Sequence, residues 1–377
     1  MQASTPANLD ASDLDALKAE NAALLEQLAA TEMSSRSARL VLPVVGLAAL
    51  GSLAIIPPGS SPIAEAVQEM ISESSRKTKV DPRAEAAMAT YFPGALGSLT
   101  TDRIVSSVLS KRGYTKDNTL FATSTCPDEV NSKPGELIDI LKNRFGENFA
   151  LGGLAGVPFT GRAGFAAYAH HAPRGGRMFI LFAPHVGVEY DGLVGALRRA
   201  NQDEVSTACG AAVGAFKALM KEKDASGAYE MPDGVSDYFD AQINFIKLKL
   251  ASRIKEVSSA PDANAFVAYQ MYTLVREFFV NELLTSPGFW DCATEVTVLG
   301  GIQINRGVGG DRFMPLMLQS CTKEEESVVD LYEEAFGPPP VDKIRDVLGT
   351  SNADVFNYRL DTYQLSDKRI AVSTANI

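Results

Sequence analysis

Apolar residues in the middle of the chain form short continuous runs that alternate with longer amphipathic stretches. Two of the runs, 119–125 (TLFATST) and 177–183 (RMFILFA), have the length and residue types of buried strands, and a third lies within 292–304. Apolar residues at helical spacing predict helices at 135–145, 209–221, 237–255 and 264–284. Strands that alternate with helices are typical of an α/β fold, in which ligands bind at strand ends.

The first 35 residues have a different pattern. Leu14, Leu17, Asn21, Leu24 and Leu28 recur at alternating spacings of three and four among acidic residues. This spacing predicts an acidic amphipathic helix within 1–35. Two heptads are too few to decide between a lone helix and a self-associating coiled coil, so both interpretations stay open.

A hydrophobic segment follows at 36–60. The chain is apolar from Leu40 to Pro57, and no charged residue occurs between Arg39 and Glu65. This length is near the minimum for a membrane-spanning helix, so the segment is a membrane anchor, a cleavable targeting signal or a buried soluble helix. A small-x-small motif at 64–66 favours cleavage, whereas the acidic residues upstream argue against it. We expect membrane association or membrane targeting through 40–57.

Three further regions complete the predicted organisation. Residues 61–85 are polar and begin beside a Pro-Pro-Gly sequence, which is typical of a linker. Residues 86–340 contain the predicted strands and most of the predicted helices, so we expect one folded domain there. Residues 341–377 predict a C-terminal helix and a polar tail.

The overall charge and the cysteine content limit the function. The net charge is −11, and no cluster of Lys and Arg suits a phosphate backbone, so we expect no nucleic-acid partner. Four cysteines in 377 residues do not make the disulfide framework of a small secreted domain. A reducing compartment is therefore the expected location, where cysteine raises the question of metal binding.

Three residues at the ends of predicted elements have the chemistry of zinc ligands. Cys126 follows the first strand, His185 follows the second, and Cys209 begins a helix. Two thiolates and one imidazole suit zinc and leave a fourth position open. Taken singly, each cysteine is more often a small buried apolar residue, so the spacing alone does not decide. Cys292 and Cys321 have no histidine near them and are expected to be packing residues.

Six sequence blocks point to a known family. They are TCPDEVN at 125–131, GGLAGVPFTGRAGF at 152–165, AHHAP at 169–173, PHVGV at 184–188, ACGAA at 208–212 and GGIQIN at 300–305. The blocks occur in the same order as in the limiting-CO2-inducible protein B/C (LCIB/C) family, which the chain resembles from about 101 to 336. Active members of this family are called θ-type carbonic anhydrases. The resemblance implies a central sheet flanked by helices, as in β-carbonic anhydrases, and a homodimer. It also implies a Zn²⁺ cofactor held by Cys126, His185 and Cys209.

The resemblance implies that an acidic residue beside the metal is paired with an arginine. Asp128 is the candidate, with a turn-capping aspartate as the alternative. In β-type relatives the arginine lies four residues after the cysteine, but that position here is Val130. Arg162 is therefore the expected catalytic partner of Asp128, and Arg198 and Arg199 are competing candidates.

Two further groups of residues are candidates for the same site. His170 and His171 are expected either to relay protons or to be structural. Phe159, Phe165 and Val186 are expected either to form the apolar pocket for CO2 or to belong to the core.

The function implied by the resemblance is reversible zinc-dependent hydration of CO2 to bicarbonate in a CO2-concentrating mechanism. The alternative is a catalytically silent LCIB-like scaffold or CO2-leak barrier. The family also implies a chloroplast location, and the segment 40–57 adds the thylakoid membrane or lumen as an expectation.

Overall fold

The computed structural model describes residues 81–199, 202–222, 240–279, 293–307, 309–322 and 328–349. Contacts divide the chain into residues 1–77 and 78–377, and every described residue belongs to the second unit. The predicted helix within 1–35, the hydrophobic segment 36–60, Cys292 and the tail after 349 lie outside the described residues. Within the described part, no helix is both long enough and apolar enough to cross a membrane.

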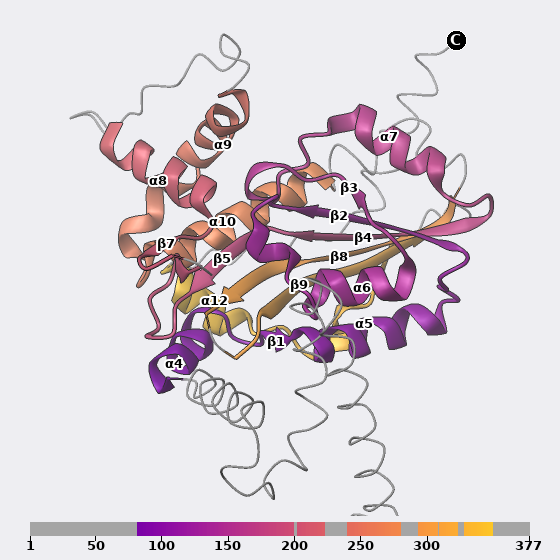
Figure 1. The fold of residues 1–377 in the computed structure, drawn as a ribbon, viewed down its shortest axis with the longest axis horizontal. Coiled ribbons are helices and arrows are strands. Elements are labelled where there is room, and N and C mark those ends of the chain that lie inside the picture. Colours follow the sequence, from indigo (N-terminus) through magenta and orange to yellow (C-terminus); the bar gives the residue numbers. More distant parts are fainter. Residues whose placement is uncertain are drawn as a thin grey trace, which may run out of the picture. The chain divides into compact units, whose positions relative to one another are not determined.

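The centre of the fold is an eight-stranded mixed sheet (Figure 1). Its main path runs in the order β1–β9–β8–β4–β2–β3, while β10 pairs with β9 and β5 pairs with β8. The strands are β1 (Leu96–Gly97), β2 (Thr119–Thr125), β3 (Phe149–Ala150), β4 (Gly176–Ala183), β5 (His185–Val188), β8 (Ala293–Arg306), β9 (Arg312–Thr322) and β10 (Val328–Asp330). A separate antiparallel pair consists of β6 (Ala196–Arg198) and β7 (Val205–Thr207).

The directions of the central strands bring the predicted ligands to one edge. β2, β4 and β8 are parallel, with Thr125 paired to Ala183 and Phe182 paired to Gly300. β5 continues β4 after a single residue and pairs with the last part of β8, starting with His185 opposite Gln303. The carboxyl ends of β2 and β4 therefore meet side by side, where ligands bind in sheets of this kind.

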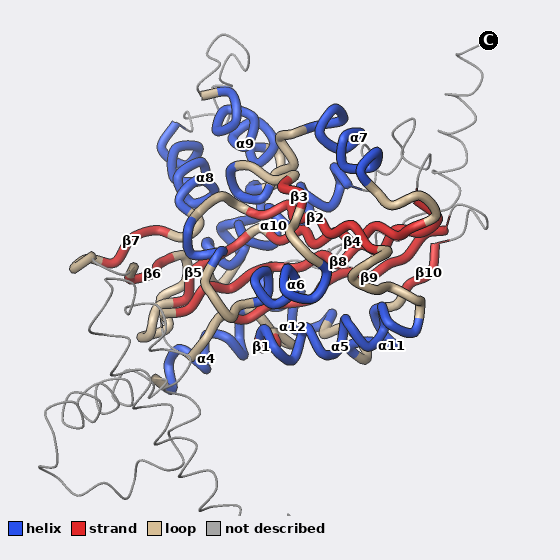
Figure 2. The backbone as a smooth tube through the Cα atoms, turned by 45° about the vertical axis from the view of Figure 1, so that its right-hand side comes forward, coloured by secondary structure: helices blue, strands red, loops and turns tan. Residues whose placement is uncertain are grey.

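Helices cover both faces of the sheet (Figure 2). One face packs against α4 (Pro82–Tyr91), α7 (Gly161–His171), α8 (Gly210–Glu222), α9 (Ala241–Ala251), α10 (Ala263–Glu277) and α12 (Val341–Leu348). The other packs against α5 (Ser98–Lys111), α6 (Leu137–Phe145) and α11 (Tyr332–Phe336). Short 3₁₀ helices are η3 (Glu129–Ser132), η4 (Leu154–Gly156) and η5 (Ile254–Ser259).

Strand β4 shows why an unbroken apolar run forms the middle of this sheet. Side chains alternate between the two faces of a strand. Accordingly Met178, Ile180 and Phe182 join the cluster under α10, whereas Phe179 and Leu181 join the cluster under α5 and α6. Each face is covered by helices, so both sets of positions are apolar.

The expected α/β fold, with a central sheet flanked by helices, is confirmed. The predicted strands at 119–125 and 177–183 correspond to β2 and β4. The final residues of the predicted linker, 82–85, form the start of α4, where Asp81 accepts a hydrogen bond from the Arg83 amide (2.8 Å) and Pro82 occupies the first turn. The sequence pattern did not predict α5, α7 or β9.

Candidate metal site

The structure brings Cys126, His185 and Cys209 together at the carboxyl edge of the sheet. Cys126 directly follows β2, His185 begins β5, and Cys209 directly precedes α8. One ligand atom from each lies within 4.8 Å of the other two, and all three residues are buried. The two Sγ atoms are 3.9 Å apart. Two Zn–S bonds of about 2.3 Å in a tetrahedral site would place the sulfurs about 3.8 Å apart.

The imidazole of His185 has one nitrogen partnered and one unpartnered. Nδ1 lies 2.7 Å from Oδ1 of Asn305, while Nε2 is buried and has no hydrogen-bond partner among the described residues. A buried polar atom without a partner is costly in a native protein. An ion bound between Nε2 and the two sulfurs would remove that cost, so these residues fit a zinc ion.

Backbone hydrogen bonds hold Cys209 against the strand that begins with His185. The Gly187 amide donates to the Ala208 carbonyl (2.8 Å), and the Ala208 amide donates to the Gly195 carbonyl (3.1 Å). Gly187 has room for no side chain, because a Cβ there would lie 2.5 Å from the Ala196 carbonyl oxygen and 3.1 Å from the Ala208 Cβ. The missing side chain therefore lets Ala196 and Ala208, the residue before Cys209, pack closely against the strand that begins with His185.

We expect Gly187→Ala to weaken zinc binding by at least about tenfold, because it pushes the segment before Cys209 away from His185. Competition with a fluorescent chelator would measure the dissociation constant. Gly214→Ala is the matched control, since a Cβ at Gly214 in α8 would meet nothing within 4 Å. It should leave zinc affinity unchanged and stabilise the helix by about 0.4–1 kcal/mol. Equal zinc affinities for the two variants would contradict the expectation.

The two thiols of the cluster have pKa values shifted in opposite directions. The hydrogen bond from Cys209 lowers the pKa of the Cys126 thiol to about 4. The same hydrogen bond, together with burial, raises the pKa of Cys209 well above its usual value. A cation between the sulfurs would favour the thiolate form of both residues.

Asp128 lies beside the cluster and is paired with Arg199. Its Oδ2 atom is 3.7 Å from Nε2 of His185. Arg199 donates from Nη1 to Oδ1 (2.6 Å) and from Nη2 to Oδ2 (2.9 Å), which is a bidentate pair. Burial raises the pKa of Asp128, but the hydrogen bonds from Arg199, the hydrogen bond with Glu129 and the charges of His185 and Arg199 together hold that pKa below its usual value. Asp128 also caps η3 through the Val130 amide (3.4 Å), so the turn-capping interpretation and the pairing are both correct.

The prediction that Arg162 pairs with Asp128 is therefore corrected. Both Asp128 oxygens accept from Arg199, whereas Arg162 is exposed in the first turn of α7. Three further acceptors hold Arg199 in place: Nε donates to Ser206 Oγ (2.9 Å), Nη2 to the Thr207 carbonyl (3.2 Å) and Nη1 to Glu129. Arg198 is exposed, and its backbone amide donates to the carboxylate of Glu189.

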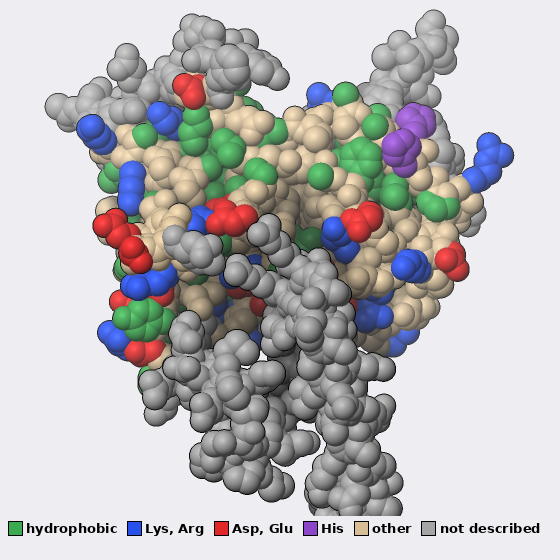
Figure 3. Space-filling view, viewed as in Figure 1, with side chains coloured by type: hydrophobic (Ala, Val, Ile, Leu, Met, Phe, Trp, Pro, Cys, Tyr) green, Lys and Arg blue, Asp and Glu red, His purple; other side chains and the backbone are tan. Residues whose placement is uncertain are grey.

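The structure does not bring His170 and His171 to the cluster. They end α7 and are exposed, and they form the purple patch in Figure 3. His171 packs on Phe149 with 5.8 Å between ring centroids, and Phe149 pairs with Ala122. Ala122 precedes Cys126 by four residues, or about 13 Å along the strand. A direct proton relay from the metal cluster through this pair is therefore not supported.

The three predicted pocket residues differ in position. Val186 is buried next to His185 in β5, in the same apolar cluster as Cys126 and Cys209. Phe165 is fully buried and packs against Tyr168 and Phe279, so its surroundings are those of a core residue. Phe159 is partly buried and meets Phe245 edge-on, with 5.6 Å between ring centroids.

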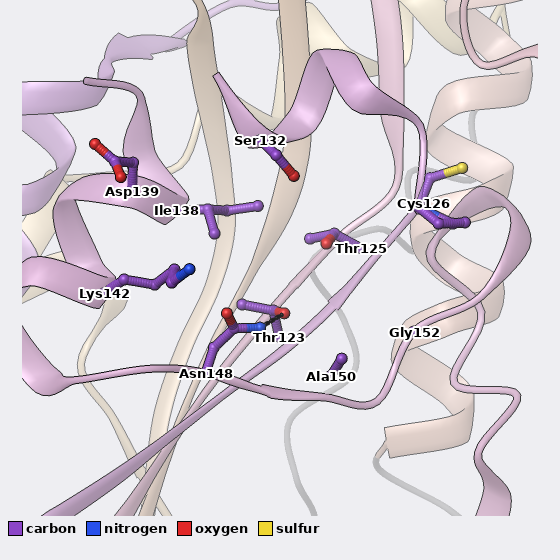
Figure 4. Close-up of a pocket in the computed structure, with 11 residues that line it drawn as sticks. Thr123, Thr125, Cys126, Ser132, Ile138, Asp139, Lys142, Asn148, Ala150 and Gly152 are labelled. Atoms are coloured by element: carbon purple, nitrogen blue, oxygen red, sulfur yellow. Dashed lines mark hydrogen bonds between the residues drawn. The ribbon is translucent and has the colours of Figure 1, made fainter. Parts of the chain in front are cut away.

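A cavity of about 230 Å³ with a mixed polar and apolar lining lies on the other side of the turn that carries Cys126 (Figure 4). Its lining includes Lys142 and Asn148, and Asn148 donates to Thr123 Oγ1 (2.6 Å). The Cys126 sulfur points away from this cavity (Figure 4). The cavity therefore contacts the back of the metal-binding turn and not the ligand atoms.

The fold and the cluster of Cys126, His185 and Cys209 together define an α/β protein with a candidate metal site at the carboxyl edge of its central sheet. Residues 95–321 match the family of limiting CO2-inducible proteins B/C beta carbonic anhydrases. The chain therefore belongs to the LCIB/C family, and the resemblance found in the sequence is confirmed.

Solved structures show the same relationship. The crystal structure of PtLCIB4, a homolog of the limiting CO2-inducible protein LCIB, is 31% identical and has a TM-score of 0.58. The alignment covers 65% of this chain and 98% of that chain. A single-residue variant of PtLCIB4 is 30% identical with a TM-score of 0.58, over 66% of this chain and 98% of that one. No curated protein matches the sequence.

Proposed function

We propose that this protein is a zinc carbonic anhydrase that interconverts CO2 and bicarbonate. The observation that carries the proposal is the buried cluster of Cys126, His185 and Cys209, in which Nε2 of His185 has no other partner among the described residues. Membership of a carbonic anhydrase family supports the same activity. Zinc bound there would act as a Lewis acid that lowers the pKa of water toward about 7.

The residues of this chain have separate roles in the proposed reaction. Cys126, His185 and Cys209 would hold the zinc ion, and a set of three protein ligands would leave room for water on it. Asp128 stays ionised at neutral pH because Arg199 holds both of its oxygens. A carboxylate oxygen keeps lone pairs for another hydrogen bond, so Asp128 accepts one from the attacking water and orients it. Val186 belongs to the same apolar cluster as Cys126 and Cys209, and this apolar surface suits a neutral substrate.

Metal removal provides the direct test. We expect the purified full-length protein to hydrate CO2 in a stopped-flow assay with a pH indicator, and to lose this activity after treatment with a strong chelator. Added Zn²⁺ should restore it, whereas Mg²⁺ should not, because thiolate and imidazole ligands favour zinc over magnesium. Bound zinc without CO2 hydration between pH 7 and 9 would instead support the silent scaffold or CO2-leak barrier.

Three further expectations belong to the same proposal. They are a homodimer, a chloroplast location within a CO2-concentrating mechanism, and membrane association through 40–57. Light scattering of the purified protein would test the first, and fractionation of plastid membranes and lumen would test the other two. A monomer, or a protein found outside plastids, would contradict the corresponding expectation.

A further inference from the structure

The second nitrogen of His185 leads into a buried chain of hydrogen bonds. Nδ1 of His185 lies 2.7 Å from Oδ1 of Asn305, near the end of β8. Nδ2 of the same Asn305 donates to the Val130 carbonyl (3.1 Å) and to Oδ2 of Asp311 (3.0 Å). Asn305 and His185 are both buried, at 0% and 3% exposure, so water does not compete for these atoms.

The partners of Asn305 leave its amide only one orientation. A backbone carbonyl and a carboxylate are both acceptors, so the NH₂ group must face Val130 and Asp311. The amide oxygen must then face His185, and because this oxygen can only accept, Nδ1 of His185 must carry the proton. In the neutral imidazole the lone pair is then on Nε2, the nitrogen that faces the two cysteines.

Asp311 is held as firmly as Asn305. It is 2% exposed, and its Oδ1 atom accepts from the Arg306 amide (2.9 Å) and from Nζ of Lys133 (3.0 Å). A buried carboxylate needs such donors to stay ionised. Lys133 directly follows η3, the helical turn that Asp128 begins. The chain of hydrogen bonds therefore connects His185 with the segment that carries Cys126 and Asp128.

We propose that Asn305, oriented by Asp311 and the Val130 carbonyl, is a positioning residue that presents Nε2 of His185 to the metal and sets its place relative to Asp128. This inference rests on the proposed function for the identity of the metal. In this proposal Asn305 and Asp311 act by orienting the His185 imidazole, and neither contacts the substrate. Replacing the hydrogen-bond partner of a metal-binding histidine typically lowers metal affinity by about 10–100-fold.

The test compares Asn305→Leu with Thr297→Val in the full-length protein. Thr297 lies on the same strand, is equally buried, and also loses hydrogen bonds when replaced, but its partners are Tyr114 and Ser320. We expect Asn305→Leu to weaken zinc binding by about 10–100-fold in chelator competition, and Thr297→Val to leave it unchanged. In the cobalt-substituted protein, only Asn305→Leu should shift the visible d–d bands, because His185 is free to turn.

A second pair of variants keeps the proposal testable if Asn305→Leu does not fold. Asn305→Asp alone places two carboxylates side by side and should weaken zinc binding. Combined with Asp311→Asn, it restores an acceptor for His185 and a donor between the two side chains at unchanged net charge, and only the Val130 carbonyl loses its donor. We expect the double variant to regain a large part of the affinity lost in Asn305→Asp and to shift the cobalt spectrum back toward that of the wild type. Failure to recover would overturn the proposal, as would equal zinc affinities for Asn305→Leu and Thr297→Val.

Measuring CO2 hydration together with zinc affinity distinguishes a failure of this inference from a failure of the proposed function. Wild-type protein that binds zinc and hydrates no CO2 would refute the proposed activity, while the affinity and spectral comparison would still decide the role of Asn305. Equal affinities with normal turnover would refute only the positioning role. Wild-type protein that binds no divalent metal would refute both.

Discussion

Replacing Cys126 with serine is expected to remove the metal and to reduce CO2 hydration at least about 10³-fold. The hydroxyl of serine is not deprotonated at neutral pH and binds zinc poorly, so only His185 and Cys209 would remain as strong ligands. Cys209→Ser and His185→Ala should have the same effect, because each removes one of three ligands from a site that has no described substitute. Metal analysis should find zinc falling from about one per chain to near zero.

Cys321 offers a matched control for the cysteine variants. It is buried at 3% exposure, close to the 6% of Cys126 and 2% of Cys209, but it lies on β9 outside the metal cluster. Cys321→Ser therefore makes the same chemical change at similar burial. It should keep the zinc and the activity, with only a modest loss of thermal stability. A comparable loss of zinc in Cys321→Ser would contradict the assignment of the ligands.

The central strands could be predicted from sequence because their patterns are local. β4 contains a continuous apolar run, and β2 is a short run of apolar residues with Thr and Ser. Both faces of the sheet are covered by helices, so burial appears in the residue types. β9 has no such clear local pattern, because Pro315 lies within it and proline usually argues against a central strand. The structure places Pro315 at a register shift opposite Gly301, where the regular hydrogen-bond ladder is interrupted.

The metal ligands could be predicted to a similar extent, and their surroundings could not. Cys126 and His185 follow apolar strands, so their place at the sheet edge follows from the pattern. The pairing of Asp128 with Arg199 joins positions 71 residues apart, through a hairpin of two three-residue strands that carry no periodic signal. Asn305 ended one of the sequence blocks that indicated the family, but no local pattern indicated that it faces His185.

Arg199→Met is expected to lower kcat/KM for CO2 hydration about 10²-fold with zinc content unchanged, since Asp128 loses both hydrogen bonds that hold its carboxylate in place. The pH profile should also change. Arg199 holds the pKa of Asp128 below its usual value, and without it burial raises that pKa. The acid limb of kcat/KM should therefore move to higher pH. In the wild type, Asp128 stays ionised down to below its unfolded pKa of about 3.9.

The free energy of unfolding should also depend on pH through the pairing of Asp128 with Arg199. Because the folded pKa of Asp128 is depressed, the pair with Arg199 stabilises the fold above pH of about 4, and this contribution is lost as pH falls through the folded pKa. In Arg199→Met the contribution is absent at neutral pH. Urea unfolding at pH 7 and at a series of pH values below 4 should therefore show a difference between wild type and Arg199→Met that is largest at pH 7 and shrinks as the pH falls.

Two neighbouring candidates serve as controls for this prediction. Arg198→Met changes the adjacent exposed arginine, and Arg162→Met changes the arginine that the sequence favoured. Both should keep the wild-type pH profile, because Asp128 accepts its bidentate pair from Arg199. Arg199→Lys should be intermediate, since an ammonium keeps the positive charge but cannot bind both carboxylate oxygens in the fork geometry of a guanidinium. An upward shift of the acid limb in Arg162→Met, with Arg199→Met unchanged, would return the role to Arg162.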